Sequence, residues 1–138
     1  MNRLSALREA IAERLGNIDD FTIYPRITDT ANVPCAWVVP DRPLVDYQQV
    51  FRGAVGQWNF LIEIITNRID IESAQDFLDE YIDPDGPFVT RLQDDTVTDA
   101  LSALTSNSVQ VLAASRYGSY KVGGTNYLGI QLSLQLWA

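Results

Sequence analysis

The chain has 138 residues, of which 46% are hydrophobic and 20% charged, and its formal net charge is −8. These proportions predict one folded domain over residues 1–138 and exclude a disordered chain. The excess of acidic over basic side chains disfavours specific binding of nucleic acids, because phosphate neutralisation requires clustered lysine and arginine.

The first expected element is a helix over residues 2–15. Four aliphatic residues recur at helical spacing and form its apolar side: Leu4, Leu7, Ile11 and Leu15. Asn2 can cap the start of this helix, and Gly16-Asn17 can end it through a left-handed residue.

Short strands are expected next. We predict strands over residues 21–24 and 35–39, a break at the prolines of 40–43, and further strands over 44–51 and 57–67. The last of these has one fully apolar face and one mixed face. That pattern predicts a central strand or a strand that meets a partner protein.

Helices are expected again in the following segment. One runs from a cap at Asp70 to about Tyr81 and is ended by the proline and glycine residues of 83–87. Short helical turns are predicted over 88–93, and a weaker helix over 97–104. Three apolar residues share one face of that weaker helix: Val97, Leu101 and Leu104.

The C-terminal residues predict a long β-hairpin, with strands over 109–122 and 125–137 joined at Gly123-Gly124. Five aliphatic residues alternate along its second strand and point to one face: Leu128, Ile130, Leu132, Leu134 and Leu136. A slip of one residue would expose all five, so this pattern fixes the register. Folding about the turn gives three cross-strand pairs: Val122 with Thr125, Tyr120 with Tyr127, and Gly118 with Gly129.

The strands are grouped rather than alternating with helices. This order predicts an α+β fold with a largely antiparallel mixed sheet. We expect the N-terminal helix and two or three further helices to pack on the sheet, which ends in the long C-terminal hairpin.

The residues that enzymes use most often are missing. Histidine is absent, which excludes serine and cysteine nucleophiles activated by histidine and histidine-ligated zinc. Cys35 is the only cysteine, and its apolar neighbours predict a buried, unreactive thiol. The acidic pairs fall at expected turns and helix ends, where aspartate serves turn geometry. We therefore expect no enzyme activity, no cofactor and no metal site.

Aromatic residues are the best candidates for a contact surface. Tyr120, Tyr127 and Trp137 lie on the hairpin face opposite the aliphatic stripe, and Trp58 lies in the strand over 57–67. Tyrosine and tryptophan are enriched where chains meet, so these four are candidate interface residues. The hairpin residues could equally pack beneath a second layer on that face.

Four segments of the chain resemble tail terminator proteins of long-tailed bacteriophages, particularly the short versions encoded by phages of actinobacteria. These are the opening helix over 4–15, the bulky strand over 58–65, SAQDFLDEYIDPDGP at 73–87, and YGSYKVGGTNYLG at 117–129. The resemblance covers nearly the whole chain in order and length, except the segment 94–107. None of the matching motifs is catalytic.

The resemblance implies a ring, usually of six copies, that caps the tail tube when it reaches its proper length. Such a ring stops the addition of tube subunits and offers its other face to the head-completion proteins of the neck. The implied partners are further copies of the chain, the major tail tube protein and a head-completion protein, with no membrane. The implied location is the virion, at the tail–neck junction, after assembly in the host cytoplasm.

The resemblance also implies a role for the acidic charge. Genomic DNA would pass through the ring without specific binding, and a negative wall would keep it from adhering. The candidate lumen residues are Asp19, Asp20, Asp94 and Asp95.

Two other functions stay open. The chain could be another phage head–tail connector or tail-completion protein of similar size. It could also be a small adaptor domain, unrelated to phages, that binds one protein through its sheet and is a stable monomer.

Overall fold

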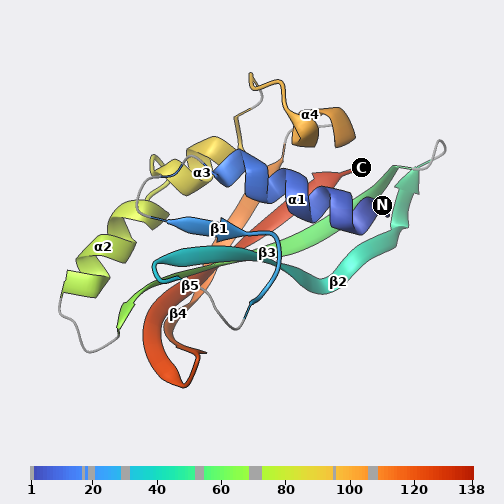
Figure 1. Ribbon diagram of the computed structural model, residues 1–138. Helices are drawn as coiled ribbons and strands as arrows, with labels where there is room; N and C mark the ends of the chain where they lie inside the picture. Colours follow the sequence, from blue (N-terminus) through green and yellow to red (C-terminus); the bar gives the residue numbers. More distant parts are fainter. Residues whose placement is uncertain are drawn as a thin grey trace.

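Five strands form one mixed sheet in the order β1-β2-β3-β5-β4 (Figure 1). The computed structural model describes residues 2–16, 18, 21–28, 32–51, 55–68, 73–94, 96–105 and 109–138, with the backbone alone at 47–51, 55, 67–68, 73–74 and 77. The strands are β1 (Thr22–Tyr24), β2 (Cys35–Phe51), β3 (Val55–Arg68), β4 (Gln110–Val122) and β5 (Thr125–Trp137). Only the β1–β2 pair is parallel. The predicted α+β class with a largely antiparallel mixed sheet is confirmed.

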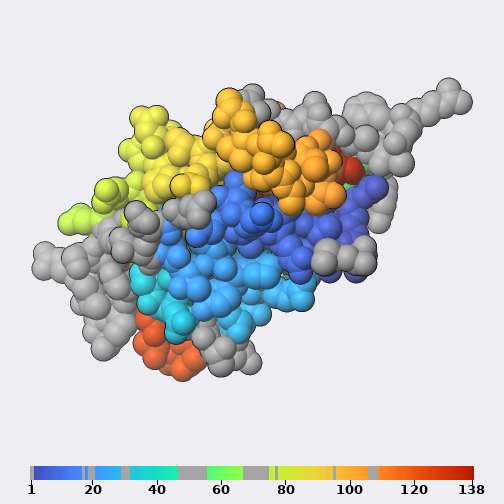
Figure 2. All heavy atoms as spheres, turned by 45° about the horizontal axis from the view of Figure 1, so that its top comes forward, coloured from blue at the N-terminus to red at the C-terminus, as the bar shows by residue number. Residues whose placement is uncertain are grey.

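Helices cover one face of this sheet, and Figure 1 shows them on the same side. In the described ranges they are α1 (Arg3–Leu15), α2 (Ser73–Ile82), α3 (Pro87–Leu92) and α4 (Ala100–Leu104). In Figure 2, α3 and α4 adjoin α1, which agrees with the contacts of α1 with both. None of these helices has the length and apolarity to cross a membrane.

The ends of α1 were predicted in part. Asn2 caps the start, its side-chain oxygen accepting a hydrogen bond from the Ser5 N–H at 2.8 Å. The predicted left-handed ending is wrong at Gly16, which has a right-handed φ of −62°. The Gly16 N–H instead donates to the Glu13 carbonyl at 3.1 Å, so a tightened last turn satisfies that carbonyl. Asn17, and also the predicted cap Asp70, lie outside the described residues.

The predicted break at residues 40–43 is wrong, because β2 continues through it. The register with β3 shifts between the pairs Pro40–Phe60 and Val45–Trp58, so the extra residues of β2 are absorbed as an irregularity. β1 pairs only with residues 35–37 of β2. The prolines therefore lie where the outer side of β2 has no β1 residue opposite it, and proline is tolerated at such a strand edge.

The C-terminal hairpin has the predicted register. Gly123 and Gly124 have φ angles of 57° and 84°, and the pairs Tyr120–Tyr127 and Gly118–Gly129 form as expected. β3 is confirmed as a central strand, since it lies between β2 and β5.

The main core lies between the sheet and α1. Five β5 residues of the predicted stripe are at most 3% exposed: Leu128, Ile130, Leu132, Leu134 and Leu136. They share the core with Phe60, Ile62 and Ile64 of β3 and with the apolar side of α1, including Leu7 and Ile11. Burying each such side chain contributes about 1.5–3 kcal/mol, which makes this layer the main source of stability.

The predicted helix over 97–104 is shorter than expected. α4 begins at Ala100 because Asp99 caps it, accepting a hydrogen bond from the Ser102 N–H at 2.9 Å. Leu101 is fully buried, but Val97 is 38% and Leu104 37% exposed. The face predicted to share three apolar residues therefore buries only Leu101 completely.

An ion pair joins α1 to the cap of α4. The Arg14 Nη2 and Nε atoms donate to the two carboxylate oxygens of Asp99 at 2.8 and 3.0 Å. The Arg14 Nη1 donates to the Leu92 carbonyl at 3.2 Å, at the end of α3. Arg14 therefore ties three helices together, and its hydrogen bonds hold the pKa of Asp99 below its usual value.

We predict that Asp99→Asn lowers the free energy of unfolding by about 2 kcal/mol at pH 7. Asparagine keeps a capping oxygen but loses the charged bonds to Arg14, and hydrogen bonds to charged groups contribute about 1.5–3 kcal/mol. Urea unfolding followed by circular dichroism measures the loss. Asp85→Asn, at an exposed turn position, is the control. Equal stability of the Asp99→Asn variant and the wild type would contradict this role.

The effect of Asp99→Asn on the free energy of unfolding should also depend on pH. The pKa of Asp99 is lowered in the folded chain. The ionised carboxylate therefore contributes fully to the free energy of unfolding above the pKa of an unfolded aspartate, about 3.9. This contribution is lost as the pH falls through the lower pKa of Asp99 in the folded chain. The stability difference between wild type and Asp99→Asn should therefore shrink below about pH 4.

Candidate assembly surfaces

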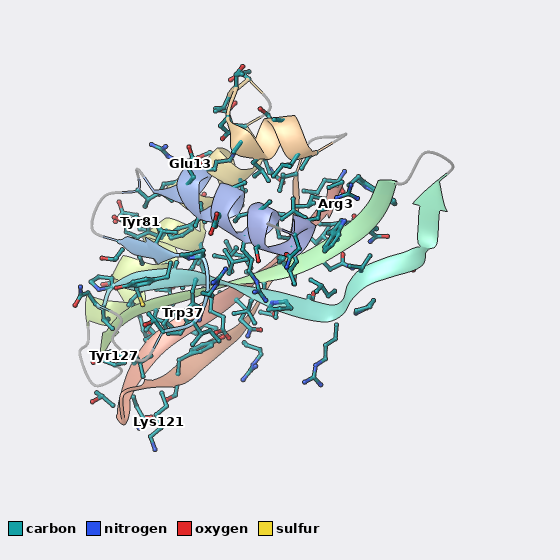
Figure 3. The ribbon with its side chains drawn as sticks, turned by 45° about the vertical axis from the view of Figure 1, so that its right-hand side comes forward. Arg3, Glu13, Trp37, Tyr81, Lys121 and Tyr127 are labelled. Carbon is teal, nitrogen blue, oxygen red and sulfur yellow. The ribbon has the colours of Figure 1, made fainter. Side chains whose placement is uncertain are left out.

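The face of the sheet away from the helices carries a small second apolar cluster. Its buried members are Cys35, Trp37 and Ile65, and no helix residue whose side chain is described belongs to it. Tyr120 and Tyr127 pack against this cluster and are half-buried. Figure 3 shows Trp37 and Tyr127 on the side of the sheet away from α1, which carries Arg3 and Glu13. The two tyrosines thus cover the cluster and still keep part of their surface exposed.

Tyr120 lies across Gly129 of the neighbouring strand. A Cβ atom placed on Gly129 would lie 2.6 Å from the Tyr120 Cδ1 and 2.7 Å from the Ile64 carbonyl oxygen. The glycine is therefore required by the close approach of an aromatic ring. The Tyr120 hydroxyl donates to the Arg116 carbonyl at 2.9 Å. Burial, with a contribution from the negative charge of Glu63, raises the pKa of Tyr120 to about 12.

Glu63 forms a polar centre on this face that the sequence did not reveal. The Trp37 Nε1 donates to one carboxylate oxygen of Glu63 at 2.6 Å, and the Gln131 Nε2 donates to the other at 2.6 Å. Gln131 is only 5% exposed. Both donors lie opposite Glu63 in the register of β2–β3 and β3–β5. The sequence signal was one acidic residue on the mixed face of β3, but its partners became visible only with the register.

The four aromatic candidates do not form one surface. Trp58 lies on the helix-covered face, where its ring stacks on Phe60 at 6.4 Å and its Nε1 donates to the Ala138 carbonyl at 3.1 Å. Trp137 of β5 pairs with Gln57 of β3 and is half-buried. Only Tyr120 and Tyr127 are brought together, in one cross-strand pair.

Most residues of the edge strand β4 are exposed. Its exposed large apolar residues include Leu112, at 56%, and Tyr117, at 44%. The register with β5 shifts between Val111 and Ala113 and again between Ser115 and Gly118, so β4 carries an extra residue at each place. Arg116, within the second shift, has a positive φ of 55°. The two register shifts fall beside Leu112 and Tyr117, and the Tyr117 hydroxyl donates to the Asp79 carboxylate of α2 at 3.1 Å.

Of the candidate lumen residues, only Asp94 lies within the described residues; Asp19, Asp20 and Asp95 do not. Asp94 accepts hydrogen bonds from the Thr96 hydroxyl at 2.6 Å and the Thr96 N–H at 2.9 Å. These bonds lower the pKa of Asp94, which stays charged at neutral pH. Its carboxylate thus serves turn geometry.

Acidic charge is concentrated in the segment that contains α2 and α3. Residues 70–99 carry ten acidic side chains and one arginine, whereas the rest of the chain carries eight acidic and nine basic side chains. The acidic side chains described on α2 and the turn after it are exposed: Asp76, Asp79, Glu80, Asp83 and Asp85. One part of the molecule is therefore strongly negative, while the rest is close to neutral.

The thiol of Cys35 is fully buried, as predicted. Burial raises its pKa to about 11, so the reactive thiolate is disfavoured at neutral pH. Among the described residues no group of histidine, cysteine and acidic side chains could hold a metal ion.

Comparison with models of protein families and with curated proteins gives no match to the chain.

We predict that Gly129→Ala lowers the free energy of unfolding by about 1–3 kcal/mol, because its methyl group would overpack against Tyr120 and the Ile64 carbonyl. Gly118→Ala is a matched control in the paired position of β4, where a Cβ would meet nothing within 4 Å. Thermal and urea unfolding of both variants measure the difference. If the two variants are equally stable, the close approach of Tyr120 does not constrain position 129.

Proposed function

We propose that the protein is a structural, non-enzymatic subunit that assembles into a ring, with six copies expected, on the completed tail tube of a long-tailed phage. The ring ends polymerisation of the tube and offers a docking surface to the head-completion proteins. The resemblance of the segments at 4–15, 58–65, 73–87 and 117–129 supports the phage assignment.

The observation that carries the assembly part of the proposal is the exposure of β4. Leu112 is 56% exposed on an edge strand, beside a sheet face whose apolar cluster includes no described helix residue. Tyr117, 44% exposed on the same strand, donates its hydroxyl hydrogen to Asp79 of α2 at 3.1 Å. Exposed apolar residues that occur together along one edge mark a contact site, whereas scattered ones need no explanation. In a ring, this edge would meet a different surface of the next copy, because ring contacts are head-to-tail.

The native mass tests the ring directly. We expect a six-copy species by analytical ultracentrifugation, either free or on purified tail tubes, with rings in negative-stain images. Twelve copies would favour the alternative of a connector on the portal side of the neck. A strict monomer that also ignores tail tubes would favour the adaptor alternative and end the ring proposal.

Leu112→Glu should weaken self-association at least tenfold, because burying an unpaired carboxylate costs more than the roughly 1.4 kcal/mol of a tenfold change. Leu104→Glu is the matched control, since this leucine is 37% exposed on α4, outside the sheet edge. Circular dichroism checks that both variants fold. Loss of rings in the control alone would assign the contact to α4 instead of β4.

The acidic residues supply the DNA-passage part of the proposal. A negative lumen repels the phosphate backbone, so DNA slides without adhering. Asp94→Lys combined with Asp95→Lys should slow DNA ejection from virions assembled with the variant. The control variant combines Asp83→Lys with Asp85→Lys, which introduces the same change of charge at another pair of acidic residues. Unchanged ejection in the first variant, or equal slowing in both, would count against a lumen position for Asp94 and Asp95.

A further inference from the structure

Two large aliphatic side chains are more than half exposed among the described residues. Ile27 is 58% and Leu112 56% exposed, whereas Val97 and Leu104 are only 38% and 37% exposed. A single exposed aliphatic residue needs no explanation, so the surroundings of each one decide whether it marks a contact.

Ile27 lies in a surface that is both apolar and basic. It follows β1 in the chain and lines a cavity of about 200 Å³ together with Lys121 and Val122 from the end of β4. Lys121 and Arg26, the residue before Ile27, are exposed, and neither forms a salt bridge within the described part of the chain. The acidic residue of the cavity lining, Glu63, already accepts two hydrogen bonds. Arg26, Ile27, Lys121 and Val122 are named the Ile27 surface.

Leu112 lies near the other end of β4. Ala113 and Ala114 follow it and are also exposed, and these three residues are named the Leu112 surface. Ten residues of strand separate Leu112 from Val122 of the Ile27 surface, a length of roughly 30 Å. Figure 3 places Lys121 at the tip of the β4–β5 hairpin, and Figure 1 shows this tip at the lower left, away from α3 and α4. The two surfaces therefore lie on different parts of one copy.

Acidic side chains flank the Leu112 surface. The backbone N–H of the residue before Leu112 donates to the Gln93 side chain at 3.1 Å, and the residue after Gln93 is Asp94, which is charged at neutral pH. Farther along β4, the Tyr117 hydroxyl donates to the carboxylate of Asp79 in α2. Both acids belong to the strongly negative segment 70–99.

We propose that the Leu112 surface of one copy contacts the Ile27 surface of the next copy in the ring. This inference rests on the proposed ring and adds the second surface that a head-to-tail contact requires. Each copy carries a net charge of −8, so copies repel one another unless their contacting surfaces differ in charge.

The charges select this pairing over the two symmetric ones. Two Leu112 surfaces would bring the flanking acids of both copies together, and two Ile27 surfaces would bring Arg26 and Lys121 of both copies together. Like charges across an interface are unfavourable. Arg116 of β4 does not reverse the sign of the Leu112 flanks, because its guanidinium lies over the Tyr120 ring, 5.8 Å from the centroid. The unlike pairing combines apolar burial with opposite charges.

Ile27→Glu tests the second surface. It should weaken self-association at least tenfold, as Leu112→Glu should, because each variant buries an unpaired carboxylate in the same contact. Leu104→Glu is again the control, and circular dichroism checks the folding of all three variants. Sedimentation at several protein concentrations gives the association constants. Rings that are lost in Leu112→Glu but intact in Ile27→Glu would overturn the proposed contact.

Chemical cross-linking tests the contact directly in a chain that carries both Ile27→Cys and Leu112→Cys. Cys35 is fully buried, so a short bis-maleimide should react only with the two introduced thiols. Their separation within one copy is too large for a short linker, so links should form between copies and produce a ladder of products up to the full ring. Each single variant should give linked pairs at most, because one thiol per chain cannot extend a ladder. Ile27→Cys combined with Leu104→Cys is the control and should give no ladder.

The outcomes separate this contact from the ring itself. Rings that form normally but give no ladder in the Ile27→Cys, Leu112→Cys chain would overturn the contact and leave the ring proposal standing. Rings that stay intact in Ile27→Glu but no longer bind tail tubes would assign the Ile27 surface to the tube protein and also overturn it. A wild-type chain that stays monomeric, even on tail tubes, would end the ring proposal and this contact with it.

Discussion

The pairing of β5 with β3 constrains nearly everything else in the molecule. Ile130, Leu132 and Leu134 lie directly opposite Ile64, Ile62 and Phe60, and all six pack beneath α1. A shift of one residue would move this entire layer to the face without helices, so no alternative register is close in free energy. The Gly123-Gly124 turn then fixes the pairing of β4 with β5 for the residues next to the turn. Farther from the turn, the bulges of β4 interrupt the alternation of its side chains between the two faces of the sheet.

The same register builds the other face of the sheet. Because Ile64 pairs with Ile130, Glu63 must lie opposite Gln131, and Ile65 opposite Gly129. The polar centre and the close contact of Tyr120 with Gly129 are therefore consequences of the core pairing. A change that loosened the leucine layer would also displace the donors of Glu63, so this polar centre depends on a core with which it shares no side chain.

Much of the fold could be predicted because its signals are local and periodic. The helix over 2–15, the hairpin register and the central strand over 57–67 follow from spacing, turn residues and alternation. The hydrogen bonds of Glu63 could not be predicted, because their donors come from two other strands, β2 and β5. These donors meet Glu63 only when both strands pair with β3. Residue chemistry alone groups Trp58 with the hairpin aromatics, but alternation along β3 assigns it to the core face with Phe60. β2 continues through its prolines because its outer edge is unpaired there. This depends on how the strands pair in the sheet, so the local sequence does not indicate it.

The edges of the sheet also limit how copies could join. Direct strand pairing needs a regular row of free N–H and C=O groups, and β4 lacks one. It has two register shifts, its Val111 N–H donates to the Gln93 side chain at 3.1 Å, and its Arg116 carbonyl accepts from Tyr120. On the opposite side, the edge consists of the three-residue strand β1 and the part of β2 beyond it, where Pro40 and Pro43 have no N–H to offer. Both edges thus resist endless sheet extension, which would produce fibres. Contact through side chains, such as the apolar residues of β4, would fix an angle between neighbours, and a fixed angle is what allows a ring to close.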